Sequence, residues 1–189
     1  AVSRRGCQGE AGRVMPNRRQ VLAVGGGGVV ALIGPAFVLA GPVEEIRMQG
    51  TSRGEHVWFA PVGLAVAAGT TLRFVNLDPG NSHTSTCYHP TLFDRPHRIP
   101  AGATPWDSDF LLPNDSFEVL LTLPGVYDFY CLPHEHAGMV GRIVVGKPGD
   151  AGWKGAAAEA GDLPAVALDG FPSVEAILKA GRVMPPGQP

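Results

Sequence analysis

The sequence predicts an all-β sandwich with a long irregular loop and a short C-terminal helix. Glycine and proline are frequent, at 26 and 18 of 189 residues, which favours short strands joined by turns. Apolar and β-branched runs recur at a spacing of roughly 8–12 residues, the pattern of a sandwich. The length suffices for one globular domain of roughly 100–150 residues plus tails.

The elements can be assigned in chain order. We expect a first strand in VEEIRMQG, two or three short strands in HVWFAPVGLAVAAGTTLRFVN, two more in DSFEVLLTLPGVYDFYC, and a last one in MVGRIVVG. Prolines interrupt residues 84–114, which predicts a long irregular connection. Residues 147–170 are expected to be linker-like. FPSVEAILKAGRV then predicts a short helix, capped by Ser173 and ended by Gly181.

Residues 1–40 are interpreted as a leader and export signal. Residues 1–14 precede a plausible start at Met15 and are interpreted as over-extended translation or a disordered leader. Arg18 and Arg19 then precede an apolar, glycine-rich run, which is typical of a twin-arginine signal. The alternative is a retained membrane anchor, since about 20 apolar residues span a bilayer. We expect an exported, periplasmic or otherwise extracytoplasmic protein, attached to a membrane only if this segment is retained.

The charge distribution argues against a nucleic-acid partner. The formal net charge is −2, and the first 40 residues hold five of the 15 basic but one of the 17 acidic residues. The remainder therefore carries a formal charge of about −6, whereas nucleic-acid-binding domains show a basic surface.

Potential metal ligands are concentrated in YCLPHEHAGMVG. Cys131, His134 and Met139 have the spacing Cys-x2-His-x4-Met. Thiolate, imidazole and thioether are soft or borderline ligands, and one more imidazole completes the trigonal His₂Cys site with a weak axial Met that suits copper. His83, in FVNLDPGNSHTS, follows a predicted strand and is the candidate for that imidazole.

Other interpretations of these residues stay open. A Cys87–Cys131 disulfide would be ordinary in an oxidising compartment and would remove the copper ligand, whereas a copper site leaves Cys87 as a buried free thiol. His136 gives the spacing Cys-x4-His-x2-Met, so we expect a surface residue there. A second metal site at His89, His97 and Asp94 is a weaker alternative, since no ligand spacing there is compelling.

Together these motifs resemble the cupredoxin family, in particular the small blue copper proteins of the plastocyanin, pseudoazurin and halocyanin type. FAPVGLAVAAGTTLRFVN, NSHT and YCLPHEHAGMVGRIVV carry the resemblance, which covers about residues 43–146. We therefore expect a cupredoxin domain at 41–146, followed by a tail at 147–189. The resemblance implies a Greek-key β-sandwich and one copper ion that alternates between Cu(I) and Cu(II). The implied partners are redox proteins such as a cytochrome, a reductase or a respiratory complex.

The resemblance also implies roles for individual residues. His83, Cys131 and His134 would form the trigonal set, with Met139 as axial ligand. His134 would be the ligand at the solvent edge. Thr84, next to His83, is expected to brace the two loops by a hydrogen bond. The expected docking patch around His134 comprises Leu132, Pro133, Ala137 and Gly138.

The neighbours of Cys131 separate an electron carrier from a copper enzyme. In multicopper enzymes built from such domains, a histidine beside the type 1 cysteine connects the copper centres. Here the neighbours are Tyr130 and Leu132, so we expect an electron carrier with no catalytic residues. The sequence leaves copper storage or delivery open.

Overall fold

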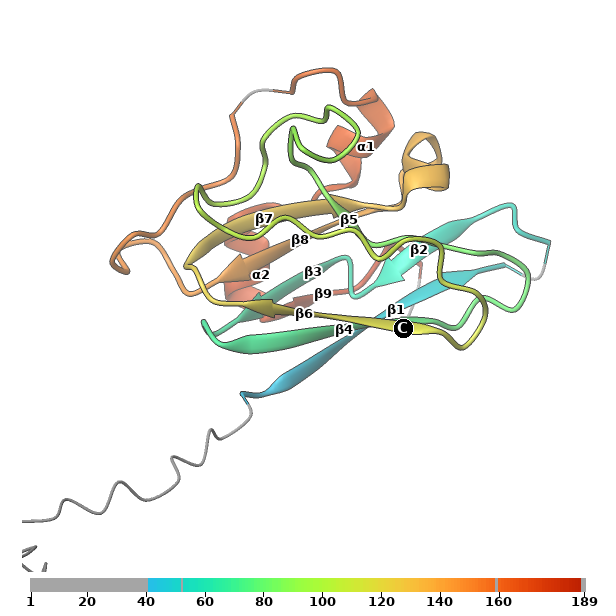
Figure 1. Ribbon diagram of the computed structural model, residues 1–189, viewed down its shortest axis with the longest axis horizontal. Helices are drawn as coiled ribbons and strands as arrows, with labels where there is room; N and C mark the ends of the chain where they lie inside the picture. Colours follow the sequence, from blue (N-terminus) through green and yellow to red (C-terminus); the bar gives the residue numbers. More distant parts are fainter. Residues whose placement is uncertain (1–40, 52, 159, 188–189) are drawn as a thin grey trace, which may run out of the picture. The chain divides into compact units, whose positions relative to one another are not determined.

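Two β-sheets pack face to face in the computed structural model, which describes residues 41–51, 53–158 and 160–187 (Figure 1). The four-stranded sheet has the order β2 (Val57–Ala60), β1 (Val43–Gly50), β4 (Thr70–Asn76) and β6 (Ser116–Leu121). The five-stranded sheet has the order β5 (Thr86–Cys87), β7 (Gly125–Tyr130), β8 (Val140–Val145), β3 (Gly63–Val66) and β9 (Arg182–Val183). The predicted all-β sandwich is confirmed.

The chain changes sheets at every connection from β2 to β7, as in a Greek-key sandwich. Strands β1 and β4 pair in parallel, as do β3 and β8, and the remaining pairs are antiparallel. As a result the connection from β4 to β5 and the connection from β7 to β8 can approach each other although they are far apart in sequence.

An aromatic cluster joins the two sheets. Phe59, Phe74 and Phe129 pack edge to face with ring centroids 4.8 to 6.4 Å apart, a favoured aromatic geometry. Gly141 faces Phe129, and a Cβ at Gly141 would lie 2.3 Å from that ring. Glycine is therefore needed at this position of β8. The tight core gives the loops at the sheet ends a rigid base.

Strands β7 and β8 are buried at every position, because the C-terminal segment covers the sheet face opposite the core. Helix α2 (Val174–Ala180) places Ile177 against Val126 and Val144. As predicted, the Ser173 hydroxyl caps this helix by accepting the Ala176 N–H at 3.1 Å, and Gly181 ends it with φ 73°. Burial on both faces accounts for the mostly apolar sequences of these strands, in which Asp128 and Arg142 are the charged exceptions.

A buried ion cluster fastens the C-terminal segment to the sheet. Asp128 accepts hydrogen bonds from Arg142 at 2.7 Å and from Arg98 at 3.0 Å. Both guanidinium groups lie over the Phe171 ring, at 5.3 Å for Arg98 and 5.0 Å for Arg142. Arg142 also donates to the Pro172 carbonyl at 3.0 Å. These charges are paired and hydrogen-bonded, which offsets the cost of burying them.

Several short elements were not expected from the sequence. Strands β5 and β9 have two residues each, and helix α1 (Ala165–Gly170) lies in the segment expected to be linker-like. Tertiary contacts stabilise such short elements more than their local propensity does. The predicted export signal falls outside the described residues. In the part of the chain that the structure describes, no helix has the length and hydropathy needed to cross a membrane.

We predict that Ile177→Ala lowers the free energy of unfolding by about 2–5 kcal/mol, because it leaves a cavity between α2 and the sheet. Chemical denaturation of the copper-free protein measures this change. Lys179→Ala, on the exposed side of the same helix, is the matched control, with an expected change below about 0.5 kcal/mol. Equal effects of the two substitutions would show that α2 does not contribute through this contact.

Candidate metal centre

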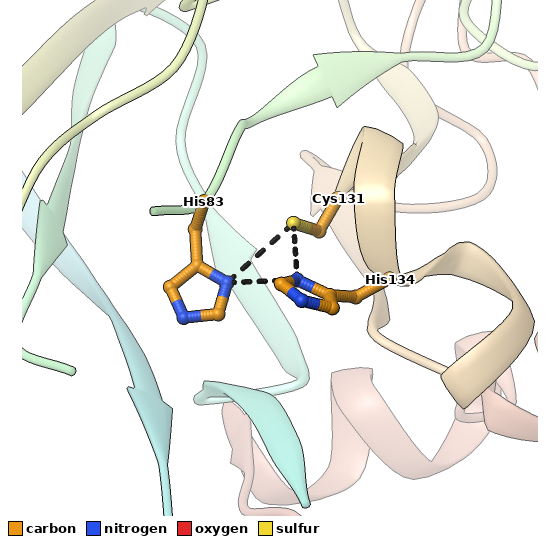
Figure 2. A group of neighbouring side chains, drawn as sticks. All are labelled: His83, Cys131 and His134. Atoms are coloured by element: carbon orange, nitrogen blue, oxygen red, sulfur yellow. Dashed lines mark hydrogen bonds between the residues drawn. The ribbon is translucent and has the colours of Figure 1, made fainter. Parts of the chain in front are cut away.

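Two loops bring His83, Cys131 and His134 together (Figure 2). His83 lies between β4 and β5 and bridges to Leu111, Cys131 follows β7, and His134 lies in the 3₁₀ helix η1 (Leu132–Ala137). The Cys131 Sγ lies 3.6 Å from the His83 Nδ1 and 3.3 Å from the His134 Nδ1. The two Nδ1 atoms are 3.2 Å apart.

This triangle of donor atoms has the size of a metal site. A point equidistant from the three atoms lies about 2 Å from each, which is the range of metal–nitrogen and metal–sulfur bonds. Both histidines present the same nitrogen, and the thiol sulfur completes a trigonal N₂S set, the arrangement that suits copper. The three atoms therefore fit the ion that the sequence predicts.

Met139 is hydrogen-bonded through its backbone to two of these residues, Cys131 and His134. Its side chain is buried, its carbonyl accepts the Cys131 N–H at 3.0 Å, and its own N–H donates to the His134 carbonyl at 3.2 Å. Gly138 has φ 79°, a left-handed conformation that favours glycine and turns the loop towards Met139. Met139 would supply the thioether, the fourth ligand that the sequence predicts for one copper ion held by His83, Cys131 and His134.

Burial sets the protonation of the ligands. It raises the pKa of the Cys131 thiol to about 11. Burial also lowers the pKa of His83, against the opposing effect of Asp78, and burial together with the nearby His83 lowers the pKa of His134. At neutral pH the imidazoles therefore have free lone pairs, and a bound cation has to displace the thiol proton of Cys131.

The structure distinguishes between the alternative roles of the cysteines and of the loop histidines. Cys87 and Cys131 are both buried free thiols, so the disulfide alternative is wrong. His136 is exposed. The His89 and His97 rings lie 4.8 Å apart, but within the described ranges the only cluster of three or more His, Cys, Asp or Glu ligands is the one around Cys131.

Hydrogen bonds connect the two loops. The Thr84 N–H points to the Cys131 sulfur at 3.3 Å, and the Thr84 hydroxyl accepts the Leu132 N–H at 2.8 Å. The hydroxyl of Thr84 also lies 2.9 Å from that of Thr86. The loop carrying His83 is thereby linked both to the Cys131 thiol and to the backbone of the next residue, Leu132.

Glu135 anchors the ligand loop from its other side. It is buried between two exposed or half-exposed histidines, accepts a hydrogen bond from the Tyr88 hydroxyl at 2.7 Å and pairs with Arg95. Arg95 also pairs with Asp162 at 3.0 Å, so the C-terminal segment contributes to this anchor. Sequence reasoning missed Glu135. The only available signal was an acidic residue inside a loop of ligands.

Asp78 is a second residue that sequence reasoning missed. It lies behind His83, where its carboxylate oxygen is 3.1 Å from the His83 Nε2. In the sequence, Asp-Pro-Gly-Asn is sufficiently explained as a turn. The residue thus gave no separate indication of a contact with a ligand.

The sequence of this chain is similar to those of known copper-binding proteins. Residues 46–146, over half of the chain, match the model of the copper binding proteins of the plastocyanin/azurin family. The chain is 32% identical over 123 residues to the chloroplastic plastocyanin of Oryza sativa subsp. indica, covering 64% of this chain and 75% of the relative. It is 33% identical to that of Chlamydomonas reinhardtii, covering 67% and 82%. A solved pseudoazurin from Sinorhizobium is 26% identical with a TM-score of 0.49, covering 74% and 98%.

We predict that Cys131→Ser abolishes the intense visible thiolate-to-copper absorption of the copper-loaded protein, because serine offers no thiolate. His136→Ala should leave the band nearly unchanged, because His136 is exposed and outside the ligand triangle. Visible absorption spectra of the two copper-treated variants measure both effects. Loss of the band in His136→Ala would show that the assignment of His134, and not His136, as the ligand is wrong.

Proposed function

The chain belongs to the plastocyanin/azurin family of copper-binding proteins and is a type 1 copper electron carrier; we propose that it passes single electrons between protein redox partners outside the cytoplasm. The observation that carries this function is the convergence of the Cys131 sulfur with the two Nδ1 atoms. Copper held by such donors alternates between Cu(II) and Cu(I), and so takes up and releases one electron at a time.

The protein's contribution is to hold the donors still. The three donor atoms already lie within 3.6 Å of one another, and both loops are tied to the sandwich. Little rearrangement is then needed when the charge of the ion changes. We propose that Thr84 supports this rigidity, since its hydroxyl and amide connect the loop of His83 to Leu132 and Cys131.

We propose that electrons enter and leave at the edge of His134. This ligand is half-buried, whereas His83 is fully buried. The residues expected to form a docking patch around His134 support the proposal by their exposure: Pro133 and Ala137 are exposed, and Leu132 and Gly138 are half-buried. Small and apolar groups here allow a partner to approach closely.

The proposed extracytoplasmic location rests on the sequence of the first 40 residues. The paired Arg18 and Arg19 ahead of an apolar run are typical of twin-arginine export. Some relatives are chloroplastic plastocyanins, which also belong to a compartment outside the cytosol. The proposed partners are other redox proteins, such as a cytochrome, a reductase or a respiratory complex.

Copper titration followed by electrochemistry tests the function. We expect the purified copper-free protein to bind one equivalent of Cu(II) with an intense visible band, and to give a reversible one-electron wave in voltammetry. A reversible wave distinguishes a carrier from a copper store, because a store does not need rapid electron exchange. A colourless complex, or a coloured one without a reversible wave, would contradict the proposed carrier.

Export can be tested separately in a bacterium that has the twin-arginine pathway. We expect the unaltered chain to reach the periplasm, and an Arg18→Lys/Arg19→Lys variant to stay in the cytoplasm. The matched control is Arg4→Lys/Arg5→Lys, which alters an arginine pair that no apolar run follows directly. Immunoblots of cell fractions measure the distribution. Equal export of both variants would argue against a twin-arginine signal.

A further inference from the structure

His83 contacts a buried carboxylate on the side opposite the donor triangle. Its Nδ1 belongs to the triangle, and its Nε2 lies 3.1 Å from the Oδ2 of Asp78. Both side chains are buried, at 0% and 1% exposure. Metal-binding histidines commonly donate their second ring N–H to such an acceptor, which fixes the tautomer and the ring orientation. Here the acceptor can carry a full negative charge.

The surroundings of Asp78 keep this charge in place. Burial alone would raise the pKa of Asp78, but hydrogen bonds from Asn81, Gly80 and His83 outweigh it, so the pKa lies below its usual value. The Gly80 N–H and the Asn81 side-chain amide each donate to the carboxylate at 2.8 Å. These hydrogen bonds come from neutral groups as well as from His83, and such donors favour the ionised form of the carboxylate.

The fold also leaves space for this carboxylate. A Cβ at Gly50, the last residue of β1, would lie 2.0 Å from the Asp78 Oδ2. Any side chain at position 50 would thus push the carboxylate away from its present position beside His83. The Asp78 N–H also donates to the Asn76 side chain at 2.9 Å, at the end of β4. Two strands of one sheet therefore define where the charge lies.

From this geometry we infer that Asp78 is a positioning residue that orients His83 and lowers the reduction potential of the copper site. A negative charge one imidazole ring away from the ion stabilises Cu(II) more than Cu(I), because the attraction scales with the charge of the ion. Burial strengthens the effect by limiting screening by solvent. The inference rests on the proposed function, since it presupposes that copper occupies the donor triangle.

The test compares Asp78→Asn with the unaltered copper protein. Asparagine has nearly the same shape but no charge. Loss of such a partner typically weakens metal binding about 10–100-fold. Where that loss falls on Cu(II), the potential rises by about 60 mV for each tenfold change in the ratio of Cu(II) to Cu(I) affinity. We expect voltammetry to show a rise in the reduction potential that corresponds to this 10–100-fold loss of Cu(II) affinity. The visible band should be retained.

A matched control separates position from charge. Asp115→Asn also removes one negative charge, from an exposed carboxylate that accepts the Leu112 N–H at 2.9 Å and does not contact a ligand. We expect a much smaller change in potential for this variant, because solvent screens exposed charges. An unchanged or lowered potential in coloured Asp78→Asn, or an equal rise in both variants, would overturn the inference.

A second measurement does not depend on the folding of a variant. In the diamagnetic Cu(I) form of the unaltered protein, ¹⁵N NMR should show a proton on the His83 Nε2 that exchanges slowly with solvent, because Asp78 accepts it in a buried position. An unprotonated or rapidly exchanging Nε2 would overturn the inference. Failure of the proposed function looks different: the unaltered protein would then bind no copper or show no visible band.

Discussion

The rest of the structure depends on one constraint: three donor atoms that have little attraction for one another must be held close together. A thiol sulfur and two imidazole nitrogens lie within 3.6 Å of one another, and two of these groups are completely buried. Unpaired polar atoms are costly to bury. The surrounding fold has to hold them there, and a soft cation at their centre turns this unfavourable arrangement into a binding site.

The fold meets this constraint by attaching both loops to separate, rigid parts of the sandwich. One loop leaves β4 and is connected to the other through Thr84, while the loop between β7 and β8 is anchored through Glu135 to Tyr88 and Arg95. The C-terminal segment belongs to the same system, because Asp162 pairs with Arg95 and Phe171 lies under two guanidinium groups. A tail distant in sequence thereby supports the ligand loop.

Much of this was predictable from the sequence, for identifiable reasons. Alternating and β-branched runs predicted the long strands, and the spacing of Cys131, His134 and Met139 singled out the ligand loop, because neighbouring ligands must lie on one turn. Elements β5, α1 and β9 were not predictable, since tertiary contacts stabilise them. Glu135 was missed because its hydrogen bond to Tyr88, which is distant in sequence, leaves no periodic pattern. Asp78 was missed because its Asp-Pro-Gly-Asn sequence is already explained as a turn. On our proposals the two histidines differ: the buried His83 connects the site to Asp78, which lowers the reduction potential, and the half-buried His134 exchanges electrons.

The most direct test of the central claim is a pair of crystal structures, of the copper-free and the Cu(II) forms. The account predicts one copper ion between the Cys131 Sγ and the Nδ1 atoms of His83 and His134, with Met139 as the remaining ligand. It also predicts that these donor atoms occupy nearly the same positions in both forms. Copper bound at His136 or Cys87, or a large displacement of either loop on binding, would contradict it.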